Sequence, residues 1–160
     1  MLGYQYLGNR DPLYERTIWA VNGILKFNGS LFRLGRGSCL CINGECTFGN
    51  RFMISGNSSI ICRKEILFGN DVLLSWDVQI MDTDYHDIYN NTGKRINEDR
   101  PIVIGDNVWL GCRALVLKGS SIPSNSIIAA GSTIAGKMYK SNCIYASNGR
   151  IIKEDITWKI

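Results

Sequence analysis

The sequence contains one histidine, His86, and no pair of cysteines in the spacing Cys-x-x-Cys. Zinc sites in proteins take three or four ligands, mostly cysteines and histidines at short spacings. We therefore expect no metal site in this chain. The six cysteines are expected to be reduced and to act as small apolar residues of the core.

Long apolar runs and a strong charge imbalance are also missing. No segment approaches the roughly 18 apolar residues of a membrane span, and the N-terminus lacks the basic and then apolar layout of a signal peptide. The net charge is only +4 and the basic residues are scattered, which argues against nucleic-acid binding. With 160 residues and 45% apolar content, we expect a single cytoplasmic domain with its own core.

A repeat of six residues is present in the second half of the chain. From Ile104 the sequence divides into IGDNVW, LGCRAL, VLKGSS, IPSNSI, IAAGST and IAGKMY. This period fits neither a helix nor a simple strand, and it predicts short strands joined by tight corners. The same rhythm appears from Phe48 with a slip of two residues, and more loosely from Leu34. The fifth places of the six sextets hold Val108, Ala114, Ser120, Ser126, Ser132 and Met138.

The sextets resemble those of the hexapeptide-repeat acyltransferases. The likeness runs from about Leu34 to Ile160 and is most specific in PIVIGDNVWLGCRALVLKGSSIPSNSIIAAGSTI. It implies an all-β fold, a left-handed parallel β-helix whose coils stack apolar residues in ladders inside a prism. On this basis we expect an N-terminal cap or irregular segment at 1–33, the β-helix at 34–140, and a closing strand and short helix at 141–160.

The rhythm breaks between Ile80 and Ile104, where the polar segment 82–101 contains His86. Long excursions from a regular scaffold are usually functional loops or disorder, and two tyrosines favour an ordered loop. In the resembled family a loop at this place projects toward a neighbouring subunit, and the catalytic histidine lies near its start. The resemblance therefore implies that His86 is the catalytic base, against the alternative of an ordinary surface histidine.

Acylation of an alcohol explains why the base would be an imidazole. The hydroxyl must lose its proton as it attacks a thioester, and a free imidazole, with a pKa of about 6.5, can accept it at neutral pH. A carboxylate on the other ring nitrogen would orient the ring, and Asp82, Asp84 and Asp87 are the local candidates. We favour Asp84, because side chains two apart on extended backbone share a face. Asp82, Tyr85 and Asp87 are expected to contact the acceptor.

The resemblance also implies acetyl-CoA as the donor, bound in a groove between neighbouring prisms of a homotrimer. Trp109 is expected to line this groove, and the backbone N–H of Gly111 or Cys112 is expected to stabilise the oxyanion. Small residues of the AAGST turn would lie against the donor, and basic residues would meet its phosphates. These further candidates are Ala129, Ala130, Lys137, Arg150 and Lys153.

The resemblance thus implies an O-acetyltransferase that acts on a sugar hydroxyl in the biosynthesis of cell-surface polysaccharide. An N-acyltransferase acting on an amino sugar or an antibiotic would share the base and the donor. A non-catalytic module whose loop binds a partner is the alternative from another class. A γ-class carbonic anhydrase would need three histidines, and a serine acetyltransferase would need a long helical region before the prism.

Overall fold

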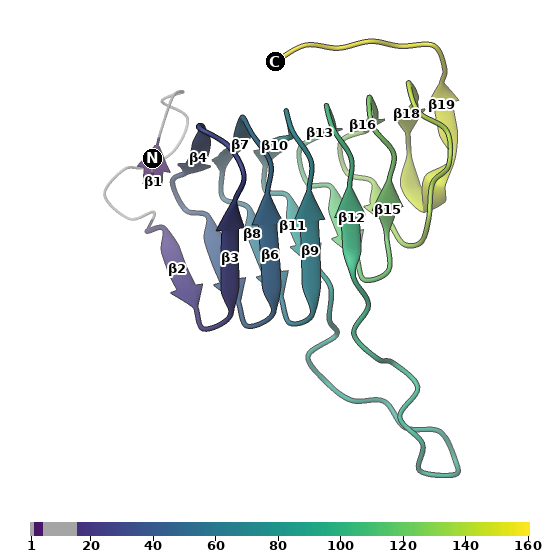
Figure 1. Cartoon of the computed structure of the whole chain (residues 1–160). Helices are drawn as coiled ribbons and strands as arrows, with labels where there is room; N and C mark the ends of the chain where they lie inside the picture. Colours follow the sequence, from purple (N-terminus) through teal and green to yellow (C-terminus); the bar gives the residue numbers. More distant parts are fainter. Residues whose placement is uncertain (1, 5–15) are drawn as a thin grey trace.

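The chain winds into a three-sided prism (Figure 1). The computed structural model describes residues 2–4 and 16–160. Successive coils give their strands in turn to three sheets, which we call A, B and C, and neighbouring strands are parallel except for the last pair, β18 and β19. The predicted left-handed parallel β-helix is confirmed.

The strands of each sheet follow one another along the prism axis. Sheet A contains β1 (Leu2–Tyr4), β4 (Phe32–Gly35), β7 (Phe52–Gly56), β10 (Leu73–Trp76), β13 (Trp109–Leu110), β16 (Ile127–Ile128), β18 (Ile144–Tyr145) and β19 (Ile151–Lys153). Sheet B contains β2 (Ile18–Val21), β5 (Cys39–Ile42), β8 (Ser59–Cys62), β11 (Gln79–Met81), β14 (Leu115–Leu117) and β17 (Thr133–Ile134). Sheet C contains β3 (Ile24–Phe27), β6 (Glu45–Phe48), β9 (Glu65–Phe68), β12 (Ile102–Ile104) and β15 (Ser121–Ile122).

The six-residue repeat builds the interior of the prism. The opening aliphatics of the six sextets and all six residues at the fifth places are buried. Burying one aliphatic side chain contributes about 1.5–3 kcal/mol relative to exposure, so stacked coils form a continuous core. In the earlier coils this core is aromatic, and the ring centroids of Phe48, Phe52 and Phe68 lie 4.5–5.0 Å apart.

The earlier coils are longer than the later ones. Ile60 pairs with Ile80, 20 residues on, whereas Val116 pairs with Ile134, 18 residues on. The extra two residues lie where sheet B turns into sheet C. In the earlier coil the inward residues Ile60 of sheet B and Phe68 of sheet C are eight residues apart, whereas in the later coil Val116 and Ile122 are six apart. The two-residue slip in the sequence is therefore a lengthened corner.

Both ends of the β-helix differ from the sequence-based expectation. Regular coils begin with β2 at Ile18 rather than at Leu34, so residues 18–33 belong to the prism, while residues 1 and 5–15 of the expected cap lie outside the described residues. The expected C-terminal helix is a single 3-10 turn, η1 (Ser147–Gly149), followed by β19. None of the helical segments in the described part of the chain is long and apolar enough to cross a membrane.

The last residues run back over the prism after β19 (Figure 1). The indole N–H of Trp158 donates to the carbonyl of Asn107 at 2.9 Å, and the Trp158 ring lies 5.8 Å from that of Trp109. Asn107 is at the corner between β12 and β13. The C-terminal segment therefore lies against the edge between sheets C and A at the coil of β12 and β13.

Residues 82–101 leave the prism between β11 and β12, at the edge between sheets B and C, and project from it as an arm (Figure 1). The arm is an ordered hairpin, in which Tyr89 and Arg95 form an antiparallel bridge and the Asn90 N–H donates to the Lys94 carbonyl at 2.9 Å. The coils on either side stay in register, since β11 pairs directly with β14. The arm is an insertion that leaves the ladder intact.

Candidate active site

Asp82 is fully buried at the point where the arm leaves the prism. Its carboxylate accepts hydrogen bonds from the backbone N–H groups of Arg63 at 2.7 Å, Lys64 at 2.8 Å and Glu65 at 2.7 Å. The expected contact between Asp82 and an acceptor sugar is therefore wrong. The side chain points into the coil above and serves the fold.

The departure of the arm explains this buried carboxylate. One coil earlier, the N–H groups of Asn43 and Gly44 donate to the carbonyl of Cys62 in the following coil, at 2.8 and 3.1 Å. The equivalent N–H groups of the next corner would be left without carbonyls, because the chain after β11 turns away into the arm. The Asp82 side chain takes the place of the missing carbonyls, which avoids buried donors without partners.

His86 follows a strained turn at the start of the arm. Its N–H donates to the Asp84 carbonyl at 2.7 Å, and Tyr85 between them has a φ of 61°. A hydrogen bond from i to i+2 around a positive φ defines a rare and strained γ-turn, and such strain concentrates at functional sites. His86 is exposed, and its imidazole makes no hydrogen bond or ion pair with any residue that the structure describes. The ring is therefore open to a substrate.

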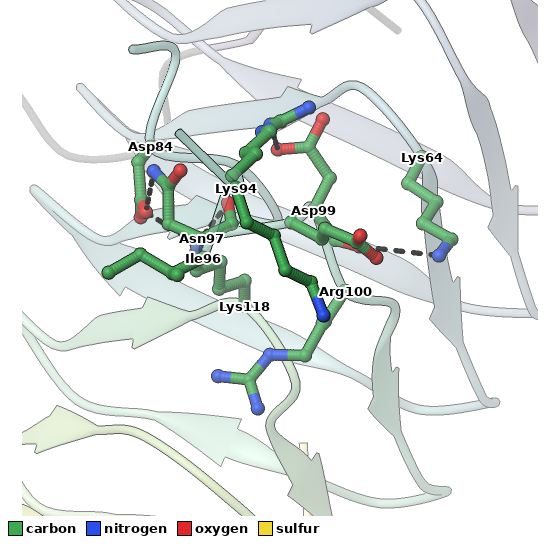
Figure 2. Close-up of a pocket in the computed structure, with 10 residues that line it drawn as sticks. Lys64, Asp84, Lys94, Ile96, Asn97, Asp99, Arg100 and Lys118 are labelled. Carbon is green, nitrogen blue, oxygen red and sulfur yellow. Dashed lines mark hydrogen bonds and ion pairs between the residues drawn. The ribbon is translucent and has the colours of Figure 1, made fainter. Parts of the chain in front are cut away.

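Asp84, expected to orient the imidazole, is bound elsewhere. Its carboxylate accepts hydrogen bonds from the Lys118 ammonium group and from the Asn97 side-chain amide, the latter at 2.8 Å (Figure 2). The same Asn97 amide donates to the carbonyl of His86 at 2.8 Å, and Lys118 also donates to the Asn97 carbonyl at 2.9 Å. We call these three side chains the clamp. Asp84 thus acts on His86 through the main chain and not through the ring.

The clamp is ionised at neutral pH. Hydrogen bonds from Lys118 and then Asn97 lower the pKa of Asp84 below its ordinary value. A carboxyl group whose pKa is lowered by folding adds stability above its unfolded pKa, about 3.9, and this stability is lost as the pH falls through the lower folded value. The Asp84 carboxylate therefore keeps its charge at neutral pH.

Tyr85 and Asp87, two expected acceptor contacts, are exposed but already have partners. The Tyr85 hydroxyl and the Cys41 thiol share a hydrogen bond of 3.6 Å, and this bond together with burial raises the pKa of Tyr85 to about 12. Tyr85 therefore stays protonated and does not compete as a base. Asp87 pairs with the Arg95 guanidinium at 3.0 Å and accepts from the Tyr89 hydroxyl at 3.2 Å. Acceptor contacts by both remain predictions.

Four of the expected donor-binding residues lie on the edge between sheets A and B. Gly111 and Cys112 follow β13, and Ala129 and Ala130 follow β16 one coil later. A Cβ at Gly111 would lie 2.7 Å from the Ala130 nitrogen, so the coils meet closely here. The Gly111 N–H already donates to the Ile128 carbonyl at 2.8 Å, which excludes it as an oxyanion donor. Among the described residues the Cys112 N–H has no partner, and it remains the candidate.

The other expected donor-binding residues are distributed over the prism. Arg150 follows η1, near the edge between sheets A and B, and Lys153 lies in β19 of sheet A. Lys137 bridges to β15 of sheet C, so it lies on a different side from Arg150. Trp109 opens β13, and its indole N–H donates to the Ser75 hydroxyl at 2.8 Å. One chain does not gather these residues into one groove.

The buried thiols are inert. Burial, the largest effect, raises the pKa of Cys62 to about 12 and also raises that of Cys46. Reactive cysteines have lowered pKa values and some exposure, so neither thiol is suited to be a nucleophile. Among residues 2–4 and 16–160, no group of three or more His, Cys, Asp or Glu side chains could hold a metal ion.

If the chain transfers acetyl groups, replacing Cys112 with alanine is expected to leave the rate within about twofold of the wild type, since the substitution keeps the backbone N–H that is the candidate oxyanion donor. Steady-state release of coenzyme A measures this. A large loss of turnover in the variant, together with a burst of acyl-enzyme in the wild type, would show instead that the thiol is the nucleophile.

Comparison with known sequences identifies the repeat. Residues 101–136 match the family described as bacterial transferase hexapeptide (six repeats). The chain is 37% identical over 81 residues to the polysialic acid O-acetyltransferase of Neisseria meningitidis, across 50% of this chain and 35% of that protein. It is 34% identical over 88 residues to the galactoside O-acetyltransferase of Lactococcus lactis subsp. lactis, across 54% of this chain and 42% of that protein. The chain thus spans less than half the length of these relatives.

Solved structures share the fold over most of the chain. The polysialic acid O-acetyltransferase OatWY matches with a TM-score of 0.64 and 24% identity, across 91% of this chain and 88% of that one. A galactoside acetyltransferase in complex with coenzyme A matches with a TM-score of 0.65 and 22% identity, across 82% and 64%. The resemblance to hexapeptide-repeat acyltransferases is confirmed, both in the repeat and in the β-helix that it builds.

Proposed function

We propose that this chain is an acetyl-CoA-dependent O-acetyltransferase that acetylates a sugar hydroxyl, with His86 as the general base. The observation that carries the proposal is the exposed imidazole at the strained turn, which has no partner among the described residues. The clamp fixes the main chain on both sides of this ring. A positioned base of this kind typically supplies about 10² to 10⁴ in rate.

In the proposed reaction the imidazole takes the proton of the acceptor hydroxyl as the hydroxyl oxygen bonds to the thioester carbonyl carbon. The carbonyl oxygen becomes an oxyanion, to which the backbone N–H of Cys112 donates a hydrogen bond. The carbon–sulfur bond then breaks, and the imidazolium returns its proton to the departing sulfur. The acetyl group passes directly to the sugar, so no side chain is acylated.

A second copy of the chain completes the proposed site. His86 belongs to the arm at the edge between sheets B and C, whereas Cys112 lies on the edge between sheets A and B. The third edge is contacted by the chain's own C-terminal segment at the same coil as Asn107 and Trp109. In a closed ring of identical prisms, the edge that carries His86 in one chain can face the edge that carries Cys112 in the next chain. A homotrimer would then contain three equal clefts.

The relatives support the acceptor class. Two of them are named for acetylation of polysialic acid and of galactosides, which are both sugars. We infer that the acceptor here is a sugar or a precursor of a cell-surface polysaccharide. An N-acyltransferase acting on an amino sugar would use the same base and donor, so the product must be identified.

The proposed function predicts acceptor-dependent release of free thiol from acetyl-CoA. We would measure it with a panel of sugars and amino sugars, and treat each product with alkaline hydroxylamine, which cleaves O-acetyl esters and spares N-acetyl amides. A hydroxylamine-labile product and a sedimentation mass of three chains are expected. A stable amide would assign the N-acyltransferase instead, and failure to bind coenzyme A would favour the non-catalytic module.

A further inference from the structure

A pocket of about 570 Å³ lies beneath the arm, between the arm and the prism (Figure 2). Its lining comes from the first turn of the arm at Asp84, from the returning half of the arm, from the lengthened corner at Lys64 and from the coil that contains Lys118. Five of the lining side chains are cationic and three are acidic. The cationic ones are Lys64, Lys94, Arg95, Arg100 and Lys118.

Two of these cations are neutralised within the protein. Lys118 is ion-paired with Asp84 in the clamp. Arg95 pairs with Asp87 at 3.0 Å and lies 3.8 Å from Asp99. These pairs hold the arm together, and they leave little positive charge for a ligand.

The other three cations form no ion pair with a carboxylate among the described residues, although the charge of Arg100 helps to lower the pKa of Asp84. Lys64 donates only to the backbone carbonyl of Asp99, at 3.3 Å. Lys94 and Arg100 make no side-chain hydrogen bond or ion pair there, and Figure 2 shows both reaching into the pocket. Of the acidic lining residues, Glu98 alone lacks a cationic partner in this part of the chain. With five cationic and three acidic side chains in its lining, the pocket carries an excess of positive charge.

Arg100 is held in place before any ligand arrives. Its backbone N–H donates to the Asp82 carbonyl at 3.1 Å, and its carbonyl accepts from the Gly119 N–H at 3.2 Å, which fixes the residue between two coils. Its guanidinium carbon would lie 3.2 Å from a Cβ at Gly119, so the group rests against glycine backbone. A fixed guanidinium presents several N–H donors in a plane that suits a carboxylate or a phosphate.

We propose that this pocket binds an anionic oxygen group of the acceptor, a carboxylate or a phosphate, with Lys94 and Arg100 as its principal ligands. The inference deepens the proposed function by naming the acceptor class, which is an acidic sugar. Asp84 and Asn97 line the pocket and also form the clamp that holds the main chain of His86. An anion bound here places the hydroxyls of the same sugar beside the base.

The test compares probes that differ in one charged group. Acetyl transfer to glucuronate, glucose 1-phosphate and glucose is measured for the wild type, Lys94→Gln and Arg100→Gln. Lys26→Gln removes one positive charge from β3, far along the chain from the pocket, and is the matched control. We expect the wild type to prefer one of the charged probes, and each pocket variant to lower that preference about tenfold, the loss typical of one charge-assisted hydrogen bond. The control should leave the preference unchanged.

Direct titration of the same probes without acetyl-CoA separates this inference from the proposed function. Binding of a charged probe that weakens in Arg100→Gln supports the pocket even if no transfer occurs. Transfer or binding that shows no preference for a charged probe, or a preference that neither pocket variant lowers, overturns it. An equal loss of coenzyme A affinity in Arg100→Gln also overturns it, since the pocket would then serve the donor. The better of the two charged probes identifies the anion as carboxylate or phosphate.

Discussion

Replacing His86 with asparagine is expected to lower acetyl transfer at least about a hundredfold, the smaller effect of removing a general base. The expected loss is in kcat, because the imidazole acts only as the hydroxyl loses its proton. Coenzyme A affinity should be retained, since the candidate donor-binding residues Cys112, Ala129 and Ala130 lie on a different edge of the prism from the arm. Thiol release under saturating acceptor, together with a separate titration of coenzyme A, measures both quantities.

Thr92→Ala is the matched control for this experiment. Thr92 lies at the exposed tip of the same arm, where its hydroxyl donates to the Asn90 side chain at 2.8 Å and to no other residue that the structure describes. Turnover in this variant should stay close to that of the wild type. Equal turnover of wild type and His86→Asn would remove His86 from the mechanism and leave the imidazole as a surface group.

Replacing Asp82 with alanine is expected to destabilise the protein by about 3 kcal/mol or more. Three backbone N–H groups lose their partner, and each buried donor without a partner costs about 1–3 kcal/mol. These N–H groups belong to the corner at residues 63–65, which supports the first residues of the arm. The variant should therefore lose acetyl transfer as well as stability. Urea unfolding followed by circular dichroism measures the change in the midpoint and in the free energy of unfolding.

The control removes an aspartate from the same arm without removing a buried acceptor. Asp87 is exposed and paired with Arg95, and exposed pairs contribute about 0–1 kcal/mol. Asp87→Ala should therefore shift the urea midpoint much less than Asp82→Ala. If the two midpoints coincide, water replaces the Asp82 carboxylate at low cost, and the structural role assigned to it is wrong.

The later coils could be predicted from sequence because the residues that become buried recur there every six positions. Each sextet from Ile104 places an aliphatic residue and a small or apolar one toward the interior, and all of them are buried. The first coil was not predicted. Its inward positions include Trp19 and Phe27, which pair with Leu40 and Phe48 but remain 42% and 45% exposed at the end of the prism. The repeat was recognised by an aliphatic residue at the start of each sextet, and aromatic residues at these positions do not fit that pattern.

The position of the candidate base could be predicted, but the roles of the neighbouring acids could not. His86 marks the interruption of the repeat, which is visible in sequence. The direction of each acidic side chain is set by a partner far away in the sequence. Asp82 accepts from the Arg63 main chain, 19 residues away, and Asp84 accepts from the Asn97 side chain, 13 residues away. One signal was available for Asp82. It lies two residues after Ile80, in the same inward column as Cys62 after Ile60, which marks it as buried.

The insertion site of the arm separates the arm from the coils that carry it. The arm leaves and returns without breaking the pairing of β11 with β14, and one side chain, Asp82, closes the corner that it opens. The arm is therefore structurally separate from the coils, whose strand pairing does not depend on it. We expect that the length and charge of the arm can change without loss of the coils, provided that an aspartate remains at position 82 to accept hydrogen bonds from the backbone N–H groups of the corner.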